Sequence, residues 1–422
     1  MNKNVKRILA LLAVGFGHGI IYLLPYMKTV FYDQMIAATG FTNAQLGQMM
    51  GIYGLVCTIS YIPGGWVADR IKPKKLITWC CLLNGLLCFA FLFVYQNFAL
   101  SMIIWLLCAL TGGFAFWPAV MKGVRLLGSK EEQGRMYGVY EAINGGASML
   151  ASFLMVWIST WFADLLAGFR GAVISMGVLG VLSALLIWWL YDEHITYNED
   201  ASESENEKIT VKEFFRVLIM PRVWIPALLL FGGIIMYDGM GYLTPWSTET
   251  VGISVALAGI LGSIREYGCR LGGIGGGFMA DKVLKSSAKW QVIAHLVCAV
   301  LAISFIGVAG LGSGASIVIM LLFGLAVYAN RVTAYSLLTE FHIPTKVAGT
   351  AIALVSMVGY IPDMFIHTLF GSWLDAHGAN GYSYIFIFLA ATGVVCACIA
   401  LVAVSMSKKI NRAKSETEVI AQ

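Results

Sequence analysis

Charged residues are scarce in this chain of 422 residues: Asp, Glu, Lys and Arg together make up 12%, whereas 59% of the residues are hydrophobic. So few polar groups cannot coat a water-soluble protein of this length, which excludes a soluble globular enzyme. A chain of this composition needs lipid as its solvent. The net charge of +5 is therefore read as a signal of membrane topology and predicts no nucleic-acid partner.

The sequence also lacks the usual patterns of catalysis and metal binding. Its nine cysteines lie inside apolar runs without a C-x-x-C pair, which predicts buried free thiols and neither disulfides nor a metal framework. The histidines lack metal-ligand spacing, and no G-x-x-x-x-G-K-S/T segment is present to bind ATP. We therefore predict a protein that is not an enzyme and has no catalytic residue, metal ion or cofactor.

Long apolar runs are what the chain has in abundance. A membrane-spanning helix needs roughly 20 apolar residues, and about twelve such runs occur, centred near Tyr22, Val56, Leu86, Ala109, Leu150, Val181, Ile235, Arg265, Ala299, Leu325, Met357 and Val394. The even number places both ends of the chain on one side of the membrane. Because short cytoplasmic loops concentrate Lys and Arg, the basic loops such as 70–75 and 282–289 predict that this side is the cytoplasm.

One long polar stretch divides the chain. It opens with the acidic run NEDASESENEK, typical of a flexible linker. We predict an N-terminal six-helix half (1–192), a cytoplasmic central loop (193–221), a C-terminal six-helix half (222–407) and a disordered cytoplasmic tail (408–422).

Two short segments about two hundred residues apart are nearly alike: GGWVADRIKPKK (64–75) and GGGFMADKVLKS (275–286). Their small residues allow helices to approach closely. An acid such as Asp69 at a helix end can bond the N-terminal amides of a neighbouring helix and pair with a nearby Arg. The duplication predicts a two-fold repeat of membrane helices.

The G-G-x-x-A-D-R/K pattern resembles the signature loop of the major facilitator superfamily, whose architecture is twelve transmembrane helices in two pseudo-symmetric halves. The segment 117–148 resembles the organophosphate:phosphate antiporter and organic anion symporter branch. It looks closer still to an uncharacterised enteric permease associated with sulfoquinovose utilisation. The resemblance implies an all-α membrane protein of the bacterial inner membrane, a monomer that works by alternating access.

In that family the loop acid is a latch that holds the cytoplasmic side closed. The resemblance thus implies a set of gating residues: Asp69, Arg70, Arg125 and Asp281. Arg125 is the expected partner of Asp69, while Arg70 also fits an ordinary topology charge.

Arg331 is the strongest candidate for a substrate-binding residue, because a charge within a membrane segment is costly and usually faces a cavity or a partner. The resemblance implies that helices one, four, seven and ten line a central cavity, and each carries polar residues. The predicted substrate-binding residues are Arg331, Arg265, Lys122, His18, Tyr22, Trp117, Asn330 and Tyr328. Cations with aromatic neighbours suit a small organic anion, since Arg grips a carboxylate, sulfonate or phosphate with two hydrogen bonds.

Other interpretations stay open for some of these residues. His18 can be a core histidine bonded to a neighbouring helix, and Lys122 can reach the cytoplasmic boundary through its flexible stem. Arg265 and Glu266 can form internal pairs between helices. The chain also departs from the organophosphate pattern in two places. Pro25 lies near the position where helix one of that branch has an Arg, and helix seven has Asp238 and no Arg.

Those departures argue against phosphate exchange and for proton coupling, because a carboxylate that alternately meets Arg or water can bind and release a proton. The predicted proton-coupling residues are Asp238, Glu141, Glu266 and Asp363. We expect a secondary active symporter of protons and a small organic anion. The alternatives are an exporter or antiporter of organic anions or drugs, and a non-transporting solute receptor on the same fold.

Overall fold

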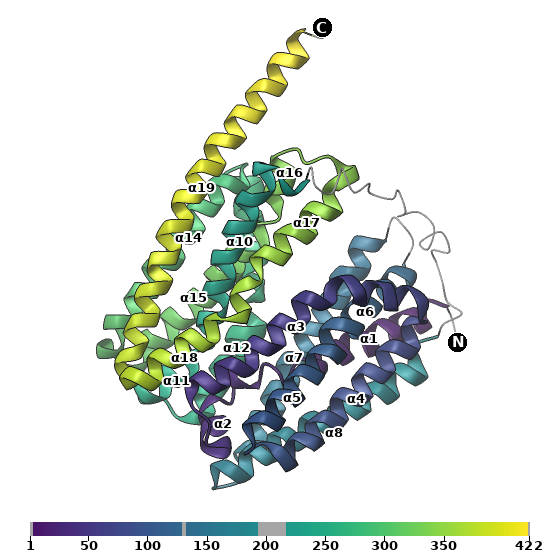
Figure 1. Ribbon diagram of the computed structural model, residues 1–422, viewed down its shortest axis with the longest axis vertical. Helices are drawn as coiled ribbons and strands as arrows, with labels where there is room; N and C mark the ends of the chain where they lie inside the picture. Colours follow the sequence, from purple (N-terminus) through teal and green to yellow (C-terminus); the bar gives the residue numbers. More distant parts are fainter. Residues whose placement is uncertain (1–2, 129–131, 193–216, 421–422) are drawn as a thin grey trace. The chain divides into compact units, whose positions relative to one another are not determined.

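The computed structural model describes residues 3–128, 132–192 and 217–420, and these form helices joined by turns, with no strand among them (Figure 1). Contacts divide the chain into two compact units. Unit 1 comprises Met1–Glu205, Ser254–Gly268 and His367–Asp375, and unit 2 comprises the rest.

Unit 1 contains most of the N-terminal helices. In chain order they are α1 (Lys3–Ile21), η1 (Met27–Thr29), α2 (Tyr32–Thr39), α3 (Asn43–Arg70), α4 (Pro73–Val94), α5 (Phe98–Ala109), η2 (Leu110–Phe116), α6 (Trp117–Leu126), α7 (Gln133–Ser159) and α8 (Leu165–Leu190), followed by α12 (Val255–Tyr267) and most of α18 (Ile366–His377).

Unit 2 contains the remaining elements. They are α10 (Pro221–Met240), α11 (Leu243–Glu249), η4 (Gly268–Leu271), α13 (Gly272–Phe278), η5 (Met279–Val283), α14 (Ser287–Val308), η6 (Ala309–Leu311), α15 (Ser313–Thr333), α16 (Ser336–Glu340), α17 (Thr345–Gly359), η7 (Ile361–Met364), η8 (Gly378–Asn380) and α19 (Gly381–Ile420). The long helices α14 and α19 lie side by side (Figure 1).

The apolar runs coincide with helices. Eight helical stretches in the described residues are long and apolar enough to cross a membrane, and the last of them, Val347–Arg412, contains two of the predicted runs. The runs of α1, α3 and α12 are not among the eight, and α12 itself has only 13 residues. The run expected around Tyr22 ends earlier, since α1 stops at Ile21 and a turn follows.

Several of the runs contain an interrupted helix. The first has the turn 22–26, α5 passes into α6 through the wider η2 turn, α10 and α11 are separated at 241–242, and α15 and α16 at 334–335. An interruption frees backbone carbonyl groups, and in lipid other protein groups must satisfy them. Trp105 Nε1 donates to the Pro25 carbonyl (3.3 Å), and the Tyr22 hydroxyl donates to the Gly112 carbonyl (3.1 Å).

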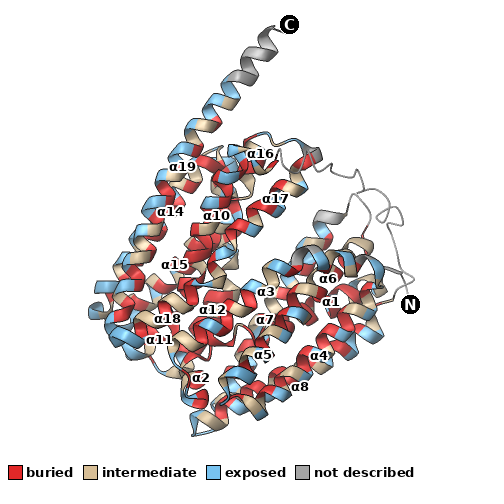
Figure 2. Ribbon diagram, in the orientation of Figure 1, coloured by how far each residue is buried: buried red, intermediate tan, exposed pale blue. Residues whose placement is uncertain are grey.

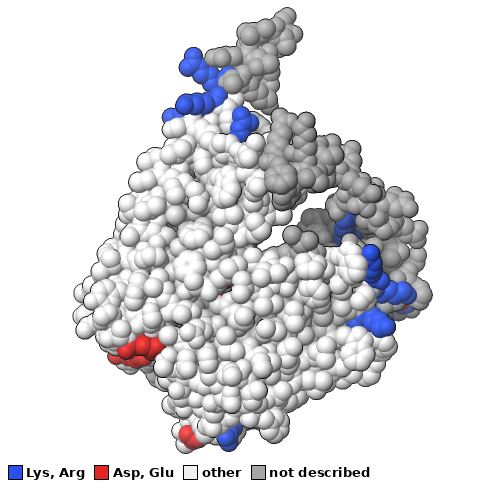
Figure 3. Space-filling view, viewed as in Figure 1, with Lys and Arg blue, Asp and Glu red and all other residues white. Residues whose placement is uncertain are grey.

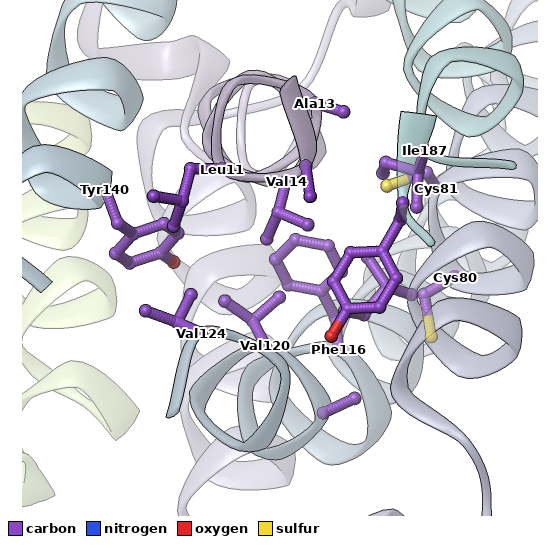
Figure 4. Close-up of a cluster of buried hydrophobic side chains, with 14 of the residues drawn as sticks. Leu11, Ala13, Val14, Cys80, Cys81, Phe116, Val120, Val124, Tyr140 and Ile187 are labelled. Carbon is purple, nitrogen blue, oxygen red and sulfur yellow. The ribbon is translucent and has the colours of Figure 1, made fainter. Parts of the chain in front are cut away.

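The core of unit 1 is a cluster of apolar side chains from α1, α4, α6 and α8. Leu11 and Val14 of α1 lie near Val120 and Val124 of α6, and Phe116 lies beside them (Figure 4). Small residues elsewhere let backbones touch, as where Gly85 of α4 meets Gly180 of α8.

The helices differ in the share of their residues that is buried. The helices α4 and α8, which are long enough to cross a membrane, carry both buried and exposed residues. In the apolar stretch that begins with α10, by contrast, 78% of the residues are buried (Figure 2). A helix that is enveloped by protein can carry polar groups without presenting them to lipid. α10 carries Tyr237 and Asp238.

Two expectations about local structure were wrong. The tail is helical, since α19 continues to Ile420 through a sequence rich in Lys, Ala and Glu, which favour helix. Cys398 is exposed and Cys57 half-buried, although the other cysteines are buried. Most of the predicted central loop, 193–216, lies outside the described residues.

Candidate functional site

Arg331 of α15 lies among tyrosines. Its guanidinium donates a hydrogen bond to the Tyr360 hydroxyl (2.7 Å) and lies 4.4 Å from the ring centre of Tyr237 and 5.5 Å from that of Tyr360. The Tyr237 and Tyr328 rings pack edge to face with centres 5.9 Å apart. Tyrosine rings attract a cation through their negative faces, so these neighbours stabilise the charge while the guanidinium stays half-buried.

Three elements of unit 2 bring this cluster together. Tyr328 and Arg331 are three residues apart on α15 and so share a face, Tyr237 comes from α10, and Tyr360 is the C-cap residue of α17. Among the residues that the structure describes, no carboxylate forms a salt bridge with Arg331. A guanidinium held by rings and one hydroxyl keeps donors for an external anion.

Asn330 lies beside Arg331 in sequence but on another face of α15. It is 1% exposed, and its carbonyl accepts a bond from Gln291 of α14. The structure thus places Asn330 at the contact between α14 and α15. Its role as a substrate ligand stays a prediction.

A second cluster of aromatic residues surrounds His18 in unit 1. Its ring centre lies 5.2 Å from Tyr22, as the four-residue spacing predicts, 5.6 Å from Trp117 and 5.4 Å from Tyr140. The Tyr140 hydroxyl is hydrogen-bonded to His18 Nδ1. The structure therefore brings together three predicted substrate residues and adds Tyr140, which the sequence did not single out.

The other basic candidates have contacts of their own. Lys122 Nζ donates to the Ala68 carbonyl (2.8 Å), at the end of α3 that carries the signature loop. Arg265 is fully buried on α12, within unit 1. Its helix is joined to α7 by the hydroxyls of Ser263 and Ser152, 2.5 Å apart.

The four candidate acids differ in burial. Asp238 and Glu266 are 5% and 6% exposed, and Asp363 is half-buried. Glu141 is exposed and accepts a bond from Asn144 within α7 (3.2 Å). Which of these acids takes part in proton coupling stays a prediction.

The gating residues stay predictions. The side chain of Asp69 lies outside the described part of the chain, so its pairing with Arg125 is not observed. Arg70 stacks on Trp66 with its guanidinium 3.5 Å from the ring, and Asp281 is exposed.

Charge is unevenly distributed on the described surface of unit 2. On the face drawn in Figure 3, blue Lys and Arg side chains lie near the C-terminal end of α19 and a red acidic patch lies at the lower left, while Asp281 is exposed beside the basic Lys282.

Besides Tyr140, the sequence did not single out Tyr360 and Gln291. Tyr360 belongs to the segment GYIPDMF (359–365), in which the sequence singled out only Asp363. Gln291 is one amide in an apolar run, and no local pattern indicates that it contacts α15.

Comparison with known proteins adds the following. The chain matches the family model described as Major Facilitator Superfamily over residues 8–367. Inner membrane protein YihN of Escherichia coli (strain K12) is 26% identical over 407 residues, covering 94% of each chain. Inner membrane protein YqcE of the same organism is 24% identical over 403 residues, covering 93% of this chain and 94% of the relative.

A more distant relative has a stated substrate. Probable galactarate/D-glucarate transporter GudP of Bacillus subtilis (strain 168) is 22% identical over 407 residues, covering 86% of this chain and 84% of the relative. Among solved structures, a bacterial homologue of the human lysosomal transporter Spinster, inward-facing and unoccupied, superposes with a TM-score of 0.74 at 17% identity, covering 96% and 97% of the two chains. At that identity the likeness shows the fold alone.

Proposed function

Because the chain belongs to the major facilitator superfamily, and is thus a multi-pass membrane transporter and not an enzyme, we propose that it carries a small organic anion coupled to protons. The expected substrates are sugar acids, sulfonated or phosphorylated sugars and carboxylates. The one observation that carries the proposal is Arg331, a cation in a membrane span that is held by tyrosines and forms no salt bridge among the described residues.

The chemistry of this cluster favours an anion over a neutral solute. A guanidinium presents parallel donors that match the oxygens of a carboxylate, sulfonate or phosphate. The Tyr237 and Tyr328 rings can pack against the carbon skeleton of a sugar derivative, as aromatic rings pack on apolar surfaces. The stated substrates of the Bacillus relative, galactarate and D-glucarate, are dianions of this kind.

We further propose that His18, Tyr22 and Trp117 contact substrate, and that Asp238 carries the coupled proton. Asp238 is buried and directly follows Tyr237, whose ring contacts Arg331. Proton binding at Asp238 would act on the anion site through α10, the helix that carries both residues, because neighbouring side chains on a helix do not face each other. Of the four candidate acids, this is the one adjacent to the Arg331 cluster in sequence.

Substitution of Arg331 tests the proposal. Purified protein is heated with D-glucarate, a hexose 6-phosphate, a sulfonated sugar or succinate, with D-glucose and choline as uncharged and cationic controls. A ligand at a hundred times its Kd stabilises the folded state by about 2.7 kcal/mol, so we expect one anion class to raise the Tm of the wild type and not that of Arg331→Ala.

Arg170→Ala is the matched control, because Arg170, an exposed residue of unit 1, also donates a 2.7 Å hydrogen bond to a tyrosine, Tyr95. Its anion response should equal that of the wild type. Stabilisation by anions that persists in Arg331→Ala, or stabilisation by D-glucose or choline alone, would contradict the proposal. Counterflow of the same labelled anion in proteoliposomes then separates a carrier from a receptor.

A further inference from the structure

The helix that carries Arg331 is interrupted two residues after it. α15 ends at Thr333, Ala334 and Tyr335 form a turn, and α16 begins at Ser336. The last carbonyl groups of a helix have no amide donor from a following turn. Because water does not satisfy them inside a membrane, the position of this part of α15 depends on which other groups bond to it.

Two consecutive residues of α14 donate to carbonyl groups near this end of α15. Gln291 Nε2 donates to the Asn330 carbonyl and to the Thr333 hydroxyl, each at 2.8 Å, and Trp290 Nε1 donates to the Ala329 carbonyl at 3.2 Å. The carbonyls of Ala329 and Asn330 are the two that immediately precede Arg331. Gln291 itself is fully buried, so no solvent competes for these bonds.

The Thr333 hydroxyl extends the network back along α15. Its single proton is shared between the carbonyls of Ala329 (3.0 Å) and Asn330 (2.9 Å), while its oxygen accepts from Gln291. Gln291 thus bonds to two neighbouring acceptors of α15, 2.9 Å from each other, and so holds this end of the helix in one rotation against α14.

The adjoining helix α13 restrains α15 as well. A Cβ atom on Gly272 or Gly276 would collide with the carbonyls of Leu325 and Ala329, so the two backbones are in direct contact there. α15 is therefore bounded by the glycines of α13 and by the hydrogen-bond donors of α14.

We infer that Gln291 is a positioning residue for anion binding, because its amide holds the end of α15 in the rotation that places Arg331 among Tyr237, Tyr328 and Tyr360. The inference rests on the function proposed for Arg331. It assigns a role in transport to a side chain on α14, a helix that the sequence did not predict to line the site.

The reactivity of Arg331 tests this position without any substrate. The purified full-length protein is treated with the arginine reagent p-hydroxyphenylglyoxal, and modification of Arg331 is followed by mass spectrometry of its peptide. Gln291→Met keeps the length of the side chain and removes the donors. We expect it to raise the modification rate of Arg331 at least fivefold, and Thr333→Val, a milder change of the same network, to raise it in the same direction.

Two controls separate positioning from general loosening. Arg170 in the same samples should react at the wild-type rate in every variant, since it lies in unit 1. Gln34→Met removes a buried glutamine of the other unit, unit 1, and should leave Arg331 reacting at its wild-type rate. An Arg331 rate within twofold of wild type in Gln291→Met and Thr333→Val, or an equal rise at Arg170, would overturn the inference.

Binding of the anion that stabilises the wild type completes the test. Gln291→Met should weaken it about tenfold, and Gln34→Met should leave it unchanged. If Arg331→Ala abolishes binding and Gln291→Met leaves it intact, the proposed function stands and the inference fails. If Arg331→Ala itself leaves binding intact, the proposed function fails and Gln291 has no role in substrate binding.

Discussion

Arg331 shows how one residue can be unfavourable for the fold and useful for function. A charged side chain in a membrane segment costs from a few to more than ten kcal/mol, depending on the reference state. Tyr237 and Tyr360 offset part of that cost with two ring faces and a hydroxyl, none of which carries a negative charge. A carboxylate partner would stabilise the guanidinium more strongly, but it would compete with an anionic substrate for the same donors.

Tyr360→Phe is the sharpest single-atom test of this cluster. The change removes the hydroxyl that accepts from Arg331 at 2.7 Å and keeps the ring 5.5 Å away. A hydrogen bond to a charged group is worth about 1.5–3 kcal/mol, so we expect anion affinity to fall about tenfold as the guanidinium loses its orientation. Ligand titration by thermal shift measures this, and the exposed Tyr384→Phe should match the wild type. Unchanged affinity in Tyr360→Phe would show that the rings alone orient Arg331.

At the scale of elements, an interrupted helix is stable only where neighbouring helices come close enough to bond to its carbonyl groups. A turn such as 334–335 is tolerated because side chains of α14 bond to the carbonyls of α15, and they reach those carbonyls because the helices are close. α13 can contact the backbone of α15 only because Gly272 and Gly276 have no side chain. Similar exchanges satisfy the interruptions near Pro25 and Gly112 in unit 1.

Neighbouring glycines of α13 allow this dependence to be measured. A Cβ on Gly276 would collide with the Ala329 carbonyl, whereas a Cβ on Gly275 meets nothing within 4 Å. We expect Gly276→Ala to destabilise the protein by about 1–3 kcal/mol through overpacking, and Gly275→Ala to be neutral or slightly stabilising, because Ala favours helix by about 1 kcal/mol over Gly. Thermal unfolding in detergent compares the two, and equal Tm values would refute the close contact.

At the scale of the whole molecule, the compact units do not follow the division of the sequence. The segments 254–268 and 367–375 belong to unit 1 although they follow the central polar stretch. Asp375 shows how one of them is held: its carboxylate accepts from the backbone amides of Asn43 and Ala44 at the start of α3 (2.9 and 2.8 Å). Carboxylates are favoured at helix N-termini, where unpaired amides gather.

Proton coupling is a property of the complete transport cycle, and Asp238→Asn separates it from substrate binding. An amide of the same shape cannot take up a proton, so we expect counterflow of labelled anion across proteoliposomes to continue while accumulation driven by a pH gradient is lost. Glu141→Gln, at an exposed position, is the control and should accumulate normally. If Asp238→Asn accumulates the anion as the wild type does, the proton is carried elsewhere, with Glu266 the next buried acid to test.

Sequence alone determined the membrane class, the places of the helices, the family resemblance and the choice of Arg331, because hydropathy, short motifs and a charge inside an apolar run are local properties of the chain. Only the tertiary structure placed Tyr360 against Arg331, Gln291 against Asn330, and the segments 254–268 and 367–375 in unit 1. These contacts join residues on helices separated in sequence, and the rotation of each helix about its axis decides which side chains meet. That rotation follows from packing and from carbonyl groups that need donors, neither of which has a local pattern in the sequence.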